Sequence, residues 1–262
     1  MDLSLNEQMV LVTGAARGIG LSVVEHLLAR NARVVATDVR IETLLSHTEA
    51  LRAQYGEKLQ CAELDVTQTD KTAAVIGALQ QQHGPIDHLV SCAGILHLGA
   101  INDMPFAQVQ ETFMVNTFGI LSVMQALCPS MKAAKRGAMV VIGSNAANTP
   151  RPNMGAYGAS KSALHMLVKC MGIELAPFGV RCNIVSPGST RTDMQMQLWN
   201  EHYGEANAIA GDAGSYRLGI PLQKIAEPAD IAKTILFLLS DAANHITMHD
   251  LRVDGGATLD NW

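Results

Sequence analysis

The sequence predicts one α/β domain with a doubly wound, parallel, seven-stranded sheet and helices on both of its faces. Short β-branched runs alternate with longer segments of helical period through all 262 residues, and such βαβα alternation is typical of a parallel sheet that is buried on both sides. A chain of this length can form a single domain, residues 1–262. The expected strands are residues 9–13, 33–37, 58–64, 87–91, 138–143, 181–185 and 248–253. The expected helices are residues 18–30, 41–55, 69–83, 107–134, 156–176 and 228–239.

The composition describes a folded protein that acts on small molecules. Apolar residues make up 48% of the chain and charged residues 16%, which excludes a largely disordered protein. The net charge of −5 and the pI of about 6.0 give no positive field for phosphate backbones, so we expect no nucleic-acid partner. A small-molecule substrate is the better expectation.

The cysteines and the N-terminal residues favour a cytoplasmic protein without a metal site. The cysteines are widely spaced, with no CxxC pair and no histidine at metal-ligand spacing. Residues 1–12 lack the basic region and the long apolar run of a signal peptide, and no stretch approaches the ~20 apolar residues that a membrane span needs. We therefore expect no membrane partner. The five cysteines are Cys61, Cys92, Cys128, Cys170 and Cys182.

A glycine-rich loop follows the first expected strand and leads directly into the first expected helix. Glycines at such a turn let backbone N–H groups approach a pyrophosphate, while the helix N-terminus supplies partial positive charge. Three spaced glycines are weak evidence alone, but the strand before them and the helix after them strengthen the pattern. We therefore expect a dinucleotide site at Thr13-Gly14-Ala15-Ala16-Arg17-Gly18-Ile19-Gly20.

Asp38 follows the second expected strand, about twenty residues after the glycine loop, where a carboxylate binds the adenosine ribose. A carboxylate there accepts hydrogen bonds from both ribose hydroxyls and repels a 2′-phosphate, so the cofactor NAD is favoured over NADP. Arg17 and Arg40 instead favour NADP, because either guanidinium could pair with its 2′-phosphate. A solvated strand end is the alternative interpretation of Asp38.

Tyr157 and Lys161 lie four residues apart at the start of an apolar helix, so both side chains project from one face. A phenol with a pKa near ~10 is a poor base at neutral pH. A cation about 4–5 Å away, at an effective dielectric constant near ~20, stabilises the phenolate by ~3–4 kcal/mol, or roughly two to three pK units. We therefore expect Tyr157 to act as a catalytic base whose pKa Lys161 lowers.

Ser144 and Asn116 are two further catalytic candidates. Ser144 closes the fifth expected strand, so it meets Tyr157 at the carboxyl edge of the sheet and can stabilise the reacting oxygen. Asn116 is a poor former of helix interiors and could bend the helix expected at 107–134 around a water that leads to Lys161. Each candidate has a structural alternative: a chance YxxxK motif, a serine that caps a turn, and a satisfied buried amide.

Together these motifs resemble the short-chain dehydrogenase/reductase family over the whole chain. The resemblance implies a Rossmann-like fold and an oxidoreductase with a nicotinamide cofactor. It also implies that Asp65 and Val66 hold the adenine, that Ala93-Gly94 lies along the dinucleotide and that Pro187-Gly188 faces the nicotinamide amide. The motifs that carry it are the glycine loop, Asp65-Val66, Ala93-Gly94, Asn116, Ser144, Tyr157-x3-Lys161, Pro187-Gly188 and Val253-Asp254-Gly255-Gly256.

Loops in the second half, among them 147–151, 186–190 and 218–222, resemble family members that oxidise a cyclic dihydrodiol carboxylic acid for siderophores. The resemblance implies hydride transfer to NAD, a proton taken by Tyr157, and aromatisation of the ring. Arg151 is the first candidate for binding the substrate carboxylate, because a guanidinium can bind it in bidentate fashion. Arg191 is the second candidate, and Met154 could form an apolar wall for the ring.

Residues 189–220 form a polar connection longer than usual, so we expect a substrate lid there. The helices expected at 107–134 and 156–176 are apolar around much of their circumference, which predicts an oligomer interface. The family's usual homotetramer fits this, although a dimer is an alternative.

Two other functions stay open. One is a different dehydrogenase of the family, such as a 3-oxoacyl carrier-protein reductase or a steroid, sugar-alcohol or cyclic-alcohol dehydrogenase. The other is a dinucleotide-binding protein without catalysis, which the fold alone does not exclude.

Overall fold

The expected seven-stranded parallel sheet is present in the computed structural model, which describes residues 3, 5–201 and 203–259. The strand order is β3-β2-β1-β4-β5-β6-β7, and every neighbouring pair is parallel. The order reverses between β1 and β4, which is the switch point where open α/β sheets bind ligands. The strands are β1 Met9–Thr13, β2 Arg33–Asp38, β3 Leu59–Glu63, β4 His88–Ser91, β5 Gly137–Ile142, β6 Val180–Pro187 and β7 Asp250–Val253.

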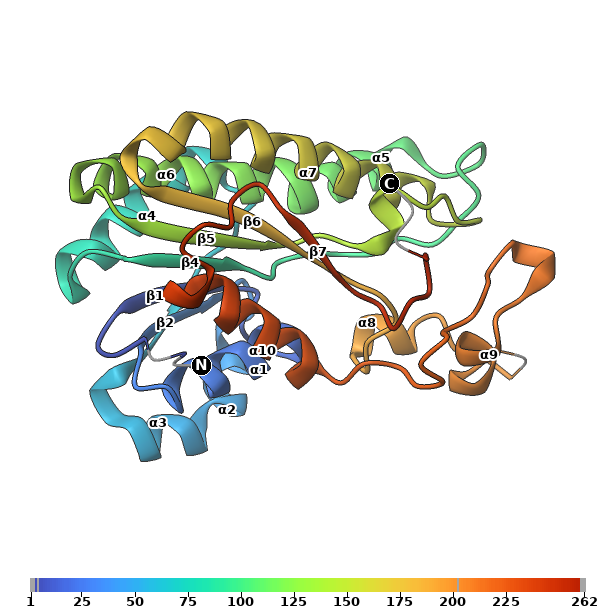
Figure 1. The fold of residues 1–262 in the computed structure, drawn as a ribbon, viewed down its shortest axis with the longest axis horizontal. Helices are drawn as coiled ribbons and strands as arrows, with labels where there is room; N and C mark the ends of the chain where they lie inside the picture. The colour runs from blue at the N-terminus through green and yellow to red at the C-terminus, as the bar shows by residue number, and fades with distance from the viewer. Residues whose placement is uncertain (1–2, 4, 202, 260–262) are drawn as a thin grey trace.

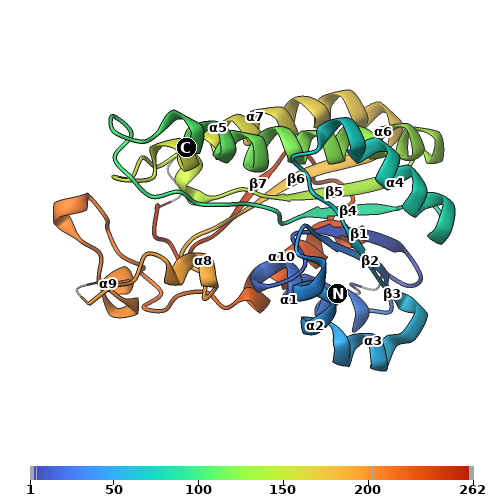
Figure 2. The same ribbon diagram turned by 180° about the vertical axis from the view of Figure 1, so that it is seen from behind.

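Helices cover both faces of the sheet, as expected (Figure 1). Figure 2 shows α4, α5, α6 and α7 on one face and α1, α2, α3 and α10 on the other. The helices are α1 Gly18–Leu28, α2 Ile41–His47, α3 Glu49–Tyr55, α4 Thr69–His83, α5 Phe106–Phe113, α6 Ile120–Ala134, α7 Gly155–Leu175, α8 Asp193–Met196, α9 Glu205–Ala210 and α10 Pro228–Leu239. Short 3₁₀ turns lie at Gly56–Lys58, Asn145–Ala147, Ala176–Phe178, Ala213–Ser215 and Asp241–Ala243.

Two apolar cores, one on each face, explain why whole strands are apolar rather than alternating. In β1, Val10 and Val12 pack into the core beneath α1 and α10, while Met9 and Leu11 pack into the core beneath α6 and α7. Successive side chains of a strand point to opposite faces. Because helices cover both faces, every position of β1 is buried and the strand reads as one apolar run.

The helix expected at 41–55 is two helices, α2 and α3, which are interrupted at Thr48. The Thr48 side chain is fully buried, and its hydroxyl donates a 2.6 Å hydrogen bond to the carbonyl of Leu44. It also lies 3.5 Å from Sγ of Cys61 on β3. A threonine hydroxyl that bonds to the preceding turn competes with the helical backbone, so the break follows from the side chain's attachment to the sheet.

The helix expected at 107–134 changes its pitch in the middle, where Met114–Gly119 is a π-helical turn between α5 and α6. A Cβ atom on Gly119 would lie 2.7 Å from the carbonyl oxygen of Val66. The absence of a side chain at Gly119 therefore lets the π turn approach the loop after β3. Such turns widen the helix by one residue and are frequent at functional sites.

By length and composition, the continuous helical stretch Phe106–Ala134 could cross a membrane, which the sequence analysis did not anticipate. Its Ile120, Val123 and Leu127 side chains are fully buried in the core against the sheet. One side of the stretch therefore packs in the core, and 44% of the apolar window is buried; a core helix passes the same test of length and composition.

The segment expected as a long loop at 189–220 contains α8, α9 and a 3₁₀ turn. In both views it projects from the main body beyond the carboxyl ends of the strands (Figures 1 and 2). Thr192 caps α8, because its hydroxyl accepts a hydrogen bond from the backbone N–H of Gln195 at 3.3 Å.

Leu127→Ala tests the core beneath α6. We expect the free energy of unfolding to fall by about 2–5 kcal/mol, because the substitution leaves a cavity at a fully buried position. Denaturant unfolding measures the change. Leu45→Ala on α2 is the matched control, since Leu45 is 37% exposed and should lose much less stability; equal losses would contradict the two-core description.

Candidate active site

A cavity of about 570 Å³ opens at the carboxyl edge of the sheet, within the usual range for ligand sites. It joins the ends of β1, β2, β4, β5 and β6 to the segment 189–220. Most residues that the sequence analysis singled out line it. These are Gly14, Arg17, Gly18, Ile19, Gly20, Asp38, Asp65, Val66, Ala93, Gly94, Ser144, Arg151, Met154, Tyr157, Lys161, Pro187 and Gly188.

The glycine loop packs too closely against its neighbours to carry side chains at two positions. Gly14 has a φ of 67°, and a Cβ there would lie 2.6 Å from the backbone nitrogen of Ala93. A Cβ on Gly20 would lie 2.1 Å from the carbonyl oxygen of Gly14. The N-terminus of α1 therefore begins at the cavity wall, where its free N–H groups favour an anion.

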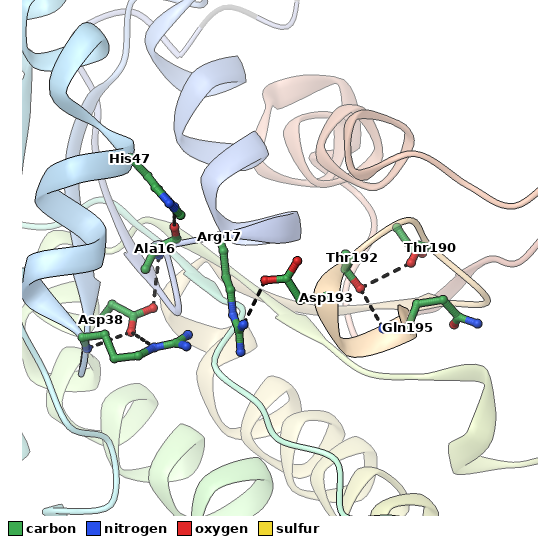
Figure 3. Close-up of polar contacts among 9 residues, drawn as sticks. Ala16, Arg17, Asp38, His47, Thr190, Thr192, Asp193 and Gln195 are labelled. Atoms are coloured by element: carbon green, nitrogen blue, oxygen red, sulfur yellow. Dashed lines mark hydrogen bonds and ion pairs between the residues drawn. The ribbon is translucent and has the colours of Figure 1, made fainter. Parts of the chain in front are cut away.

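Asp38, the last residue of β2, lies beside this loop, with its carboxylate held by the backbone (Figure 3). Its Oδ2 accepts a hydrogen bond from the N–H of Ala16 at 3.1 Å, and its Oδ1 accepts one from the N–H of Arg40 at 3.0 Å. The Nε of Arg40 lies 3.7 Å from Oδ1. Each carboxylate oxygen can accept a further bond, so Asp38 can also bind a diol.

Arg17 turns away from Asp38 and forms an ion pair with Asp193 of α8, at 2.9 Å from Nη1 to Oδ2 (Figure 3). Both side chains are largely exposed, so the pair contributes little stability. It nevertheless joins the glycine loop to the segment 189–220 across the cavity. Asp193 was not predicted from the sequence, because no local pattern connects it with a loop 176 residues earlier.

Tyr157, Lys161 and Ser144 converge where β5 ends and α7 begins. Lys161 is 2% exposed, its Nζ lies 5.9 Å from the centroid of the Tyr157 ring, and it donates a 2.8 Å hydrogen bond to the carbonyl of Ile142. The Ser144 side chain interacts with Tyr157 and lowers its pKa, against the larger effect of burial. The Ser144 hydroxyl also accepts the N–H of Ala146 at 3.1 Å.

The expected electrostatic effect of Lys161 on Tyr157 is wrong for the protein as the structure describes it. Burial raises the pKa of Tyr157, and the contributions that lower it come from Ser144 and Arg151 rather than from Lys161. Burial also lowers the pKa of Lys161 to about 8. The i, i+4 spacing places the two side chains together as expected. The pKa values, however, depend mainly on the burial of both groups, which the spacing does not indicate.

Asn116 lies on the π turn and is fully buried. Its Oδ1 accepts the N–H of Ile95 at 2.8 Å, and its Nδ2 donates to the carbonyl of Ile95 at 3.0 Å and to Oγ of Ser160 at 3.2 Å. The expected distortion of the helix is present. The amide is bonded to the chain after β4, and it is outside the set of residues that line the cavity.

The two arginines proposed for a carboxylate differ in their surroundings. Arg151 lines the cavity beside Tyr157, and its Nη2 donates a 2.8 Å hydrogen bond to Oδ1 of Asn145. Arg191 does not line the cavity. Its guanidinium binds Glu205 through two hydrogen bonds of 2.9 and 2.8 Å and Glu227 through one of 2.8 Å, so two carboxylates already occupy it.

Pro187 and Gly188 continue β6 into the cavity wall, supported by the C-terminal motif. The N–H of Gly188 donates to the carbonyl of Val253 at 3.0 Å, and a Cβ on Gly188 would lie 2.6 Å from Cβ of Asp254. Oδ2 of Asp254 accepts a hydrogen bond from Nδ2 of Asn145 at 3.1 Å. The closing motif therefore holds both the β6 end and the turn after Ser144.

Arg217, near the end of the segment 189–220, also lines the cavity and was not predicted from the sequence. Its only sequence signal was membership of that polar segment. Within the described part of the chain, no three His, Cys, Asp or Glu side chains could hold a metal ion together.

Comparisons with known proteins agree with this geometry. A family model described as enoyl-(acyl carrier protein) reductase matches residues 14–258. The vibriobactin-specific 2,3-dihydro-2,3-dihydroxybenzoate dehydrogenase of Vibrio cholerae is 59% identical over 99% of both chains. The 2,3-dihydro-2,3-dihydroxybenzoate dehydrogenase of Bacillus subtilis is 42% identical over 96% of both. A solved short-chain type dehydrogenase/reductase from Mycobacterium marinum is 30% identical over 98% of both chains, with a TM-score of 0.86. The chain therefore belongs to the short-chain dehydrogenase/reductase family.

Proposed function

We propose that this protein oxidises 2,3-dihydro-2,3-dihydroxybenzoate to 2,3-dihydroxybenzoate with NAD, as a step of siderophore biosynthesis. The observation that carries the reaction class is one cavity with the glycine loop and Asp38 on one side and Ser144 and Tyr157 on the other. The identity of the substrate is supported by the names of the relatives from Vibrio cholerae and Bacillus subtilis.

The residues of the cavity fit a dinucleotide. The loop at Gly14 and Gly20 leaves no space for side chains and exposes the N-terminus of α1. Asp38 supports NAD over NADP, because a carboxylate pairs with a ribose diol and repels a phosphate. Arg17, which could have paired with that phosphate, is bonded to Asp193. When bound, NAD supplies the acceptor for the hydride.

The chain's own residues would position the substrate and move its proton. The Ser144 hydroxyl hydrogen-bonds the oxygen that is being oxidised. Tyr157, as phenolate, takes the proton of that hydroxyl while the ring carbon loses its hydride. Ser144 and Arg151 lower the pKa of this phenol against the larger effect of burial, and Lys161 holds the helix that carries it through its hydrogen bond to Ile142. The product of this step is a keto-diene, which becomes the aromatic catechol by moving one ring proton to oxygen, and aromatisation makes the direction oxidative.

We further propose a cytoplasmic homotetramer. All five cysteines are free thiols, as in a reduced compartment. The layer of α5, α6 and α7 leaves large apolar side chains exposed, among them Phe106, Phe118, Met166 and Ile173. A patch of this kind favours burial against further copies of the chain.

Tyr157→Phe tests the proton transfer. We expect turnover of the dihydrodiol acid to fall by about 10²–10⁴-fold, because the proton acceptor is lost. NADH formation measures turnover and calorimetry measures NAD binding, which should persist. Full activity of the variant would remove Tyr157 from the mechanism.

Asp38→Asn tests the choice of cofactor. We expect NAD affinity to fall by about 10–100-fold, since hydrogen bonds to a charged group contribute ~1.5–3 kcal/mol, and the ratio of NAD to NADP affinity to fall as well. Titration calorimetry with both dinucleotides gives the ratio. Glu42→Gln, at an exposed position of α2, is the control, and an unaltered ratio in Asp38→Asn would argue against the assignment.

Lys161→Met tests whether the ammonium of Lys161 is buried, through the pH dependence of the free energy of unfolding. Burial holds the pKa of Lys161 at about 8, below its ordinary value of 10.5, so the unfolded chain binds more protons between these values. The free energy of unfolding should therefore gain a contribution that rises with pH from about 8 to about 10.5. The variant should lack this rise in denaturant unfolding at matched pH. Identical slopes would show that the Lys161 amine is solvated.

A further inference from the structure

Arg217 brings a second guanidinium to the substrate end of the cavity. It lines the same cavity as Ser144, Arg151 and Tyr157, but it comes from the far end of the segment 189–220. The positive charge of Arg217 also contributes to a lowered pKa of Arg151, after the larger effect of burial. Two like charges therefore face one region from two separate elements.

The backbone at Arg217 is fixed by a tight turn. Asp212 and Arg217 exchange two backbone hydrogen bonds of 2.9 Å each. The Asp212 carboxylate accepts the N–H of Gly214 at 3.0 Å and the hydroxyl of Ser215 at 2.6 Å. This network closes the 3₁₀ turn Ala213–Ser215 and holds the start of the Arg217 side chain in one place.

The guanidinium of Arg217 is only partly satisfied by the protein. Its Nη1 donates a 2.7 Å hydrogen bond to the hydroxyl of Tyr203, whose ring centroid lies 5.7 Å from the guanidinium carbon. Nη2 lies 3.8 Å from Sδ of Met154, which is a weak acceptor. The Nε–H is buried and has no hydrogen-bond partner among the described residues. A guanidinium has five donors, so most of its hydrogen-bonding capacity is left for an anion.

No carboxylate in the described part of the chain forms an ion pair with Arg151 or Arg217. The acidic side chains that line the cavity have other partners: Asp38 with Ala16 and Arg40, Asp65 with Thr67, Glu111 with His97, and Asp193 with Arg17. Arg191 differs from Arg151 and Arg217, because Glu205 and Glu227 neutralise its charge outside the cavity. Asp254 interacts electrostatically with Arg151, and Asp212 with Arg217, without forming an ion pair, so the positive charge of the substrate end is only partly compensated.

We propose that Arg217 is a substrate-binding residue which, with Arg151, forms a two-guanidinium site for the carboxylate of the ring substrate. The inference rests on the proposed function for the identity of the ring, but the site itself requires only a compact carboxylate. Because guanidinium groups bind carboxylates through paired hydrogen bonds, a bound acid relieves the repulsion between the two arginines. It also ties the segment 189–220 to the loop before α7, which favours acids over uncharged cyclic alcohols.

Binding of 2,3-dihydroxybenzoate and of catechol, which differ only in the carboxylate, tests the proposal by calorimetry on the NAD-loaded protein. For Arg217→Gln we expect the acid to bind about 10–100-fold more weakly. Arg217→Lys, which keeps the charge without the planar fork, should lose less. Every variant should bind catechol as the wild type does, whether that binding is measurable or absent. Arg191→Gln is the matched control from the same segment and should leave acid binding unchanged.

The outcomes separate this inference from the proposed function. An Arg217→Gln variant that binds the acid as tightly as the wild type overturns the inference, and so does an equal loss of acid, catechol and NAD affinity, which would indicate a disturbed segment. An Arg217-dependent acid site in a protein that does not oxidise the dihydrodiol acid would support the inference and refute the proposed function. Oxidation of that acid by Arg217→Gln with an unchanged KM would support the proposed function and refute the inference.

Discussion

The buried ammonium of Lys161 is the constraint on which the site depends. A charge removed from water is costly unless hydrogen bonds compensate it, and here the carbonyl of Ile142 at the end of β5 accepts one. That bond fixes the second turn of α7 against the sheet edge. Tyr157, four residues earlier on the same helix, and Ser144, two residues beyond Ile142, are placed by the same contact. The geometry of the candidate site is therefore a consequence of how a strand end and a helix start are joined.

The segment 189–220 contacts both ends of the cavity through polar and exposed interactions. At the dinucleotide end, Asp193 pairs with Arg17, and the Cγ2 of Thr192 would lie 3.2 Å from a Cβ on Gly18. At the substrate end, Arg217 reaches Met154. Exposed ion pairs contribute little stability. The opening of this segment to admit and enclose ligands stays a prediction from the length of the segment.

The strands of the sheet could be predicted from the sequence, because each strand is marked by a run of apolar residues that are neighbours in the chain. Residues of β1 such as Val10 and Leu11 must be apolar when both faces of the sheet are covered, so the strands could be read from the chain. The interruption at Thr48 could not, because it depends on contact with Cys61 on another element. The π turn at Gly119 likewise depends on the close approach of Val66.

The candidate site shows the same division between local and distant causes. The spacing of Tyr157 and Lys161 predicted their proximity, but their pKa shifts follow from burial, which spacing does not report. Arg191 and Arg217 are both arginines of one polar segment, and no neighbouring residue type distinguishes them. Their roles separate only through partners, since Glu205 and Glu227 come from two other elements and neutralise Arg191.

The distribution of charge along the cavity gives a physical basis for selectivity. One end carries the carboxylate of Asp38, which suits neutral hydroxyls and opposes a phosphate. The other end carries Arg151 and Arg217, which suit an acid, whereas beside an uncharged alcohol some of their N–H groups would have no acceptor. Sites built around buried polar groups reject ligands that leave those groups unpaired far more strongly than apolar pockets reject a change of size. The charges at the two ends would therefore orient the acid as well as select it, because an acid that exchanged ends would place its carboxylate beside that of Asp38.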